Sequence, residues 1–262
     1  MRLPAPVSTA LGDAWFEPSP IDGYDRAAMI VLAADTSTSF NSVAVCDGGA
    51  VLAESCANLG RRHSERLLDT VDWVLSEAGL TLDAIELLAI AVGPGSFTGL
   101  RVGVATWKGL AAGLNVPLAG IGTLDALVRT APFINETVCP LLDARMKEVF
   151  GAVYRFDSGQ RIEMASARVA SVESIIGGLK GPVTFLGDGA ALYRDRILEC
   201  VPGAHFMPDA FSIPRGWAVA AEALDRIAHG LEADAAHVEP FYLRKAQAMT
   251  ILERRAAETV AP

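Results

Sequence analysis

Residues 30–39 read IVLAADTSTS, an apolar run that ends at Asp35 and continues into four small hydroxyl residues. This pattern is typical of a buried strand that leads into a turn. Residues 42–46 and 50–54 are two further apolar stretches, and Asp47-Gly48-Gly49 between them predicts a hairpin. In that hairpin residue 46 pairs with residue 51, so Cys46 does not face Cys56 and a disulfide between them is not expected.

Helices and strands then alternate. The apolar residues between 67 and 78 fall on one helical face that Gly79 ends, and residues 87–92 form a fully apolar strand. A helix over 100–112, a strand over 118–121 and a helix over 123–130 follow. The predicted order of this first half is β-β-β-α-β-α-β-α.

The second half repeats this order. A strand over 138–142 ends in Asp143, a hairpin joins 149–155 to 161–170, and a helix covers 171–178. A strand over 183–186, a helix over 190–200, a brief strand over 205–207 and a helix over 214–230, with Pro214 in its first turn, complete the copy. Two such copies predict an α/β fold of the actin, sugar-kinase and Hsp70 superfamily, with two ribonuclease H-like lobes around a cleft.

The predicted division of the chain follows from these elements. Residues 1–28 form a flexible extension, and Met29 is a candidate for the natural start. The first lobe covers 29–132 and the second covers 133–246. The last helix of the second lobe is a candidate for packing back on the first lobe. Residues 247–262 form a tail.

Composition excludes several classes of protein. The chain has 262 residues, of which 51% are hydrophobic, and this excludes global disorder. A net charge of −9 argues against unaided nucleic-acid binding. No apolar run is long enough to span a membrane and no secretory signal is present, so a cytoplasmic protein is expected. The four cysteines have no metal-binding or redox spacing.

In this superfamily the turn after the first strand of each lobe cradles phosphate. In this chain neither of these two turns contains glycine. Asp35, Thr36 and Ser37 form the first turn, and Asp143 and Arg145 belong to the second. Gly187 and Gly189 form a further turn of the second lobe. Two interpretations stay open: these are vestigial nucleotide loops, or the hydroxyl groups satisfy their own backbone.

Residues 93–99, GPGSFTG, form the most distinctive loop, but their spacing matches neither a phosphate-binding loop nor a nucleophile elbow. The helix that follows carries small residues at intervals of about four: Gly99, Gly103, Ala105, Gly109 and Gly113. Such a stripe permits close approach of another backbone, either within the lobe or across an interface between chains. His63, without a second ligand at helical spacing, is interpreted as a surface residue rather than a catalytic or metal-binding one.

Four segments closely resemble the bacterial TsaB (YeaZ) family: residues 30–38, residues 62–68, residues 93–103, and Asp143-Ala144-Arg145. The resemblance covers about residue 29 to Ala246 and includes the late sequence FYLRK at 241–245. It implies a role in the threonylcarbamoyl modification of the adenosine next to the tRNA anticodon. The family is paralogous to the catalytic subunit TsaD, whose metal-binding His-x-x-x-His aligns with Thr123 and Leu127 here. Neither residue replaces an imidazole.

The resemblance therefore implies a non-catalytic scaffold that binds and activates TsaD in an assembly with the ATPase TsaE, without a metal, a catalytic residue or direct nucleic-acid binding. Alone, the chain is expected to form a homodimer through the same face. Whether a nucleotide binds at the TsaD interface stays open. The expected interface residues lie on the first two helices: His63, Arg66, Leu67, Thr70, Val71, Val74, Leu100, Val104, Trp107 and Lys108. An ATP-dependent phosphotransferase or ATPase of the same fold is the alternative.

Overall fold

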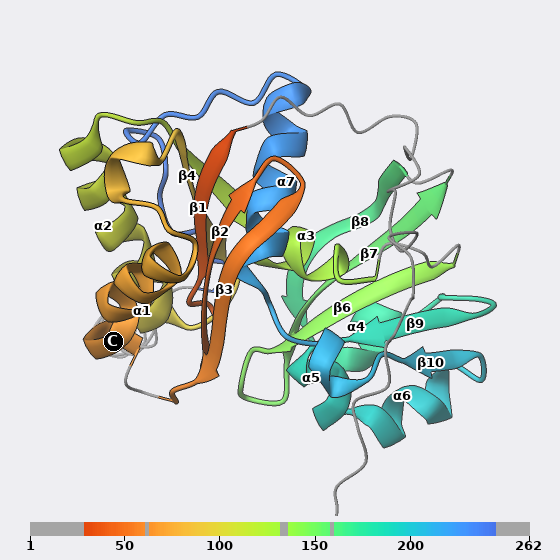
Figure 1. Cartoon of the computed structure of the whole chain (residues 1–262). Coiled ribbons are helices and arrows are strands. Elements are labelled where there is room, and N and C mark those ends of the chain that lie inside the picture. Colours follow the sequence, from red (N-terminus) through yellow and green to blue (C-terminus); the bar gives the residue numbers. More distant parts are fainter. Residues whose placement is uncertain (1–28, 61–62, 132–135, 158–159, 245–262) are drawn as a thin grey trace, which may run out of the picture.

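The computed structural model describes residues 29–60, 63–131, 136–157 and 160–244, and these form two lobes, each built on a five-stranded sheet (Figure 1). The predicted extension over 1–28 and the tail over 247–262 lie outside the described residues. The first sheet has the order β3-β2-β1-β4-β5, and the second has the corresponding order β8-β7-β6-β9-β10. In both, the first strand pairs antiparallel with the second and parallel with the fourth. This duplicated topology and the order of elements confirm the predicted fold class.

The elements of the first lobe are β1 (Ile30–Asp35), β2 (Phe40–Asp47), β3 (Ala50–Asn58), α1 (His63–Glu77), β4 (Leu87–Gly93), α2 (Phe97–Leu114), β5 (Leu118–Gly122) and α3 (Thr123–Val128), with a short 3₁₀ helix, η1, at Leu82–Ala84. The hairpin register pairs Cys46 with Val51, as predicted. Because Ser96 accepts a hydrogen bond from the backbone N–H of Gly99, α2 begins at Phe97, three residues before the predicted start.

The second lobe contains β6 (Thr137–Asp143), β7 (Val149–Asp157), β8 (Gln160–Ala170), α4 (Val172–Ile176), β9 (Val183–Leu186), α5 (Asp188–Leu192), α6 (Arg194–Cys200), β10 (Ala204–Phe206) and the 3₁₀ helix η2 (Asp209–Phe211), before α7 (Gly216–Ala228). The prediction of a single helix over 190–200 is wrong. The structure has two helices that meet at Tyr193, and the first already begins at Asp188.

The last helix, α7, packs on the sheet of the first lobe, on the face opposite α1 and α2 (Figure 1). Its start is two residues later than predicted, so Pro214 lies before the helix. The reason is docking on β2: the backbone N–H of Gly216 donates to Ser42 Oγ at 2.9 Å. A Cβ atom on Gly216 would come within 2.7 Å of the backbone nitrogen of Ala44, so only glycine allows this approach.

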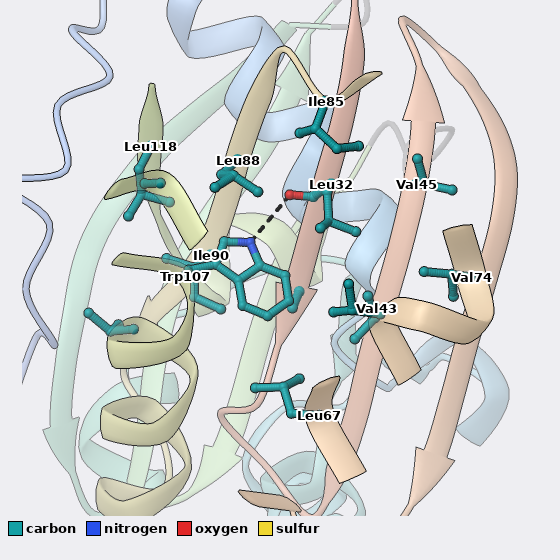
Figure 2. Packing of buried hydrophobic residues seen from close by; sticks show 14 of the residues in the cluster. Leu32, Val43, Val45, Leu67, Val74, Ile85, Leu88, Ile90, Trp107 and Leu118 are labelled. Carbon is teal, nitrogen blue, oxygen red and sulfur yellow. Dashed lines mark hydrogen bonds between the residues drawn. The ribbon is translucent and has the colours of Figure 1, made fainter. Parts of the chain in front are cut away.

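The core of the first lobe lies between the sheet and the pair α1 and α2. Figure 2 shows Trp107 of α2 at its centre, with no exposed surface, where the indole N–H donates to the backbone oxygen of Leu32 at 3.3 Å. A buried indole with its polar atom satisfied fixes the helix on the strand. In the second lobe, α3 covers one face of the sheet and α4 and α6 cover the other.

Candidate functional site

The turn after β1 is buried, and its hydroxyl groups form hydrogen bonds within the protein. Asp35, Thr36 and Ser37 are each no more than 2% exposed. The backbone N–H and the hydroxyl of Ser37 both donate to Asp35 Oδ1, at 2.8 and 2.7 Å. Thr36 Oγ1 donates to the backbone oxygen of Gly99 at 2.8 Å. Both hydroxyls therefore donate within the protein, that of Ser37 to a side chain and that of Thr36 to the backbone of α2.

The loop over 93–99 covers this turn directly. The backbone N–H of Ser96 donates to the backbone oxygen of Ser37 at 2.6 Å. A Cβ atom on Gly95 would lie 2.7 Å from the Cβ atom of Ser37, and one on Gly99 would overlap the carbonyl oxygen of Thr36. These two glycines therefore let the backbone of the loop lie directly against the backbone of the turn.

Asp35 is the unusual group of this turn. Burial raises the pKa of its carboxyl to about 6, and the two hydrogen bonds from Ser37 oppose that rise. Its second oxygen, Oδ2, is buried and has no hydrogen-bond partner among the described residues. Burying a carboxyl with one oxygen unpartnered costs free energy, which the surrounding fold must supply.

The turn after β6 is open to solvent. The side chain of Arg145 is 84% exposed and forms an ion pair with Asp143 at 3.0 Å. Arg145, Met146 and Lys147 all have left-handed backbone, with φ of 61°, 56° and 63°. Three consecutive non-glycine residues in this region are rare, and each stores strain that surrounding contacts must hold.

Gly187 and Gly189 lie against the end of β6 rather than in an open loop. A Cβ atom on Gly187 would overlap the backbone oxygen of Leu141, and one on Gly189 would come within 2.9 Å of the backbone carbon of Leu142. Between them, Asp188 accepts a hydrogen bond from the backbone N–H of Asp143 at 2.9 Å. Burial, with the charge of Asp143, raises the pKa of Asp188. Both glycines thus have a packing role.

The predicted interface residues do not lie on one surface. Six of them are buried in the core of the first lobe, with at most 3% exposure: Leu67, Val71, Val74, Leu100, Val104 and Trp107. Their side chains do not reach a partner, so that part of the prediction is wrong. Periodicity identifies the apolar face of a helix, but here that face packs on its own sheet. Side chains on the other faces of α1 are exposed, including Leu68 at 56% and Trp73 at 50%.

The other four predicted interface residues have different positions. Arg66 is exposed, and Thr70 is half-buried with its hydroxyl donating to the backbone oxygen of Arg66 at 2.7 Å. Lys108 is half-buried, and its Nζ donates to the backbone oxygen of Val238 at 3.0 Å. His63 is the first residue of α1, and its side chain lies outside the described part of the structure.

The stripe of small residues on α2 divides into two parts. Gly99 and Gly103 face Thr36, so tight packing within the lobe accounts for them. Gly109 and Gly113 have nothing within 4 Å of the place of a Cβ atom, and both are exposed, as is Ala105. The inner half of the stripe is therefore explained by the lobe itself, and the outer half is left uncovered.

Thr123 and Leu127, the two positions to which the resemblance assigns lost metal ligands, are packed inside the protein. Both residues lie on α3 and have no exposed surface, and Leu127 belongs to the core that α3 forms with the sheet of the second lobe. Within the described ranges, no cluster of three or more His, Cys, Asp or Glu side chains is placed to hold a metal ion. In the same ranges, none of the helices combines the length and apolar character needed to cross a bilayer.

A buried group of charges between the lobes was not predicted. Glu222 of α7 is fully buried and binds three guanidinium groups, from Arg129, from Arg161 at 2.6 Å and from Arg226 at 2.7 Å. Arg161 belongs to β8 of the second lobe, so this cluster joins the lobes. The sequence offered one signal, an acidic residue on the apolar face of a helix, at a position that the periodicity assigns to the core.

Comparisons with known proteins agree with one another. A family model described as TsaD, tRNA N6-adenosine threonylcarbamoyltransferase, matches residues 51–252. The tRNA threonylcarbamoyladenosine biosynthesis protein TsaB of Escherichia coli is 33% identical over 225 residues, which are 82% of this chain and 95% of that protein. The protein of the same name from Bacillus subtilis is 28% identical over 185 residues, 70% of this chain and 81% of that protein.

Solved structures give the same result. The structure of YeaZ from Pseudomonas aeruginosa matches with a TM-score of 0.72 and 29% identity, over 82% of this chain and 100% of that chain. A second structure from the same organism, with the same TM-score and identity, is described as similar to peptidase YEAZ.

Proposed function

The chain belongs to the TsaD-type threonylcarbamoyltransferase family and, within it, to the TsaB (YeaZ) proteins, and from that premise we propose that it is a non-catalytic subunit that binds and activates TsaD. Its role lies in the biosynthesis of threonylcarbamoyladenosine in tRNA, which its relatives are named for. The assembly includes the ATPase TsaE, and the tRNA is held by other subunits.

One observation carries the non-catalytic part of the proposal. The turn where this fold cradles phosphate is buried under the loop over 93–99, and the backbone of that loop is hydrogen-bonded to Ser37. A phosphate entering there would have to displace the loop and the contacts of Gly99 with Thr36. The same contacts disfavour the alternative, a phosphotransferase or ATPase of this fold.

The partner-binding part rests on the surface that α1 and α2 leave uncovered. Leu68 and Trp73 are large apolar side chains about half exposed on α1, and Gly109 is uncovered on α2. Half-exposed large apolar side chains on one helix and an uncovered glycine on its neighbour suit packing of another helix pair. The outward faces of α1 and α2, rather than the apolar faces first predicted, are therefore the proposed contact with TsaD and with a second copy of this chain.

Mixing the purified protein with TsaD of the same organism tests this proposal. Size-exclusion chromatography with light scattering should give a complex with the summed mass of one copy of each chain. Two separate peaks at micromolar concentration would contradict the proposal. Calorimetry with ATP and Mg²⁺ separates it from the alternative, because turnover by this chain alone would favour a phosphotransferase.

A further inference from the structure

The segment that follows α7 passes from one lobe to the other. Val238 is 7% exposed and belongs to the core of the first lobe, near Gly120 of β5. Leu243 packs against the core of the second lobe. Only four residues separate these two anchors, so residues 238–244, called the strap below, cross between the lobes by the shortest path.

On the first lobe the strap is held at the end of β4 and the start of α2. The backbone N–H of Phe241 donates to the backbone oxygen of Val92 at 2.7 Å. Arg101 Nε donates to the Tyr242 hydroxyl at 2.9 Å, and its guanidinium lies 3.9 Å from the centre of the Phe97 ring. The rings of Phe97 and Tyr242 are 4.9 Å apart. Stacking and hydrogen bonding thus fix the strap on α2.

On the second lobe Arg244 holds the left-handed turn after β6. Its Nη1 donates to the backbone oxygen of Ala144 at 2.8 Å, and the guanidinium forms an ion pair with Glu148. The backbone N–H of Glu148 in turn donates to the oxygen of Arg145 at 3.0 Å and closes the turn. Arg244 therefore joins the strap to the strained part of the second lobe.

A second connection between the lobes is the buried cluster on Glu222. There Arg161 of β8 reaches Glu222, and the Tyr154 hydroxyl of β7 donates to Asp125 of α3 at 2.9 Å. The chain also returns from the second lobe to the first between β10 and α7. Glu222 has no exposed surface, whereas Arg244 and Glu148 are 24% and 39% exposed. Glu148 is partly exposed, so a substitution at Arg244 breaks this connection without leaving a fully buried charge behind.

We propose that residues 238–244 are a strap that keeps the two lobes closed, and that Arg244 is the pin whose release lets them open about α3 and α7. The proposal does not depend on the proposed function, because it concerns only contacts within this chain. It predicts that breaking the Arg244 contacts changes the distance between the lobes, while breaking an equivalent contact inside one lobe does not.

Distances between spin labels test this prediction on the full chain. One label is placed on Cys200, which is exposed on α6, and the other on Ala50→Cys at the exposed β2–β3 turn, in a Cys56→Ser background. Cys46 and Cys139 are buried, so they do not take a label. Excess unlabelled protein ensures that only pairs within one molecule are measured.

Arg244→Met is compared with Arg168→Met, since Arg168 also donates to a backbone oxygen, that of Ser174 at 2.7 Å, but within the second lobe. The parent and Arg168→Met should give one narrow distance. Arg244→Met should add a population at longer distance. An unchanged distribution in Arg244→Met, or a broad one already in the parent, would overturn the proposal.

Hydrogen exchange gives a second readout that needs no label. In Arg244→Met the amide of Phe241, which lies on the other lobe, should exchange about tenfold faster, the effect of losing one hydrogen bond to a charged group. Unchanged exchange at this amide would count against the strap. Should Arg244→Met fail to fold, Arg101→Gln removes the contact with Tyr242 and is expected to give the same two results.

Discussion

The contact between the loop over 93–99 and the turn after β1 predicts a large difference between two glycines on one helix. In Gly99→Ala, the new methyl group would overlap the carbonyl oxygen of Thr36, which is backbone and does not rotate away. In Gly109→Ala, the methyl group meets nothing within 4 Å. The two variants make the same chemical change on α2, so Gly109→Ala is a matched control.

The expected magnitudes follow from two opposing effects. Replacing glycine by alanine inside a helix stabilises by about 1 kcal/mol. Overpacking against fixed backbone costs about 3 kcal/mol. Gly99→Ala should therefore lower the free energy of unfolding by about 2 kcal/mol and the melting temperature by about 4–8 °C for a chain of this size. Gly109→Ala should raise the melting temperature by about 2–4 °C.

Urea unfolding followed by circular dichroism, together with thermal melts, measures both quantities. If the loop covers the turn as described, the two variants shift stability in opposite directions. Equal stability of Gly99→Ala and Gly109→Ala would contradict the close contact of Gly99 with Thr36, because the turn would then have room for a methyl group.

Three further predictions concern other parts of the molecule. Asp35 has a pKa of about 6 in the folded protein and about 3.9 when unfolded, so the folded state binds more protons between these values and stability falls as pH rises through them, by about 2–3 kcal/mol. Asp35→Asn should lack that fall in urea titrations from pH 4 to 7.5, and a parallel pH profile would contradict the assignment. Glu222→Gln should lose about 2 kcal/mol of unfolding free energy, because it removes the buried carboxylate shared by Arg129, Arg161 and Arg226 and leaves them Asp225 and Asp125 as carboxylate partners. Glu173→Gln, in an exposed pair, should leave the stability nearly unchanged; similar losses in both would argue against a buried cluster. Trp73→Ala should weaken the affinity for TsaD at least about tenfold in a titration by light scattering or calorimetry. Leu198→Ala, which changes an exposed residue of the second lobe, should leave the affinity unchanged. Equal affinities of the two variants would show that α1 is not part of the interface.

Much of the fold could be predicted from the sequence because its signals are local. The apolar run that ends at Asp35, the Gly48-Gly49 turn and the single apolar face of α1 each specify an element without knowledge of the rest. The errors lie at element boundaries that distant contacts decide. The start of α7 is set by the hydrogen bond from Gly216 to Ser42, 174 residues away.

The site could be predicted less well, because periodicity does not say which surface an apolar face will cover. Trp107 and Val71 were expected near a partner, and both fill the lobe's own core. The contacts of Arg244 with Ala144 and Glu148 join residues about 100 positions apart and have no local signal. The sequence spacing predicts the stripe of small residues on α2. Only the contacts with Thr36, which lies on a distant turn, show which half of the stripe is packed within the lobe.

In the proposed function, this chain acts on tRNA modification only through TsaD. The most direct measurement is formation of threonylcarbamoyladenosine in tRNA by purified TsaD and TsaE, with their remaining substrates, in the presence and absence of this protein. We expect product only when TsaD and this chain are both present, and none from this chain alone. Modification by this chain without TsaD, or an unchanged rate when it is added to TsaD, would contradict its proposed role as a non-catalytic activator of TsaD.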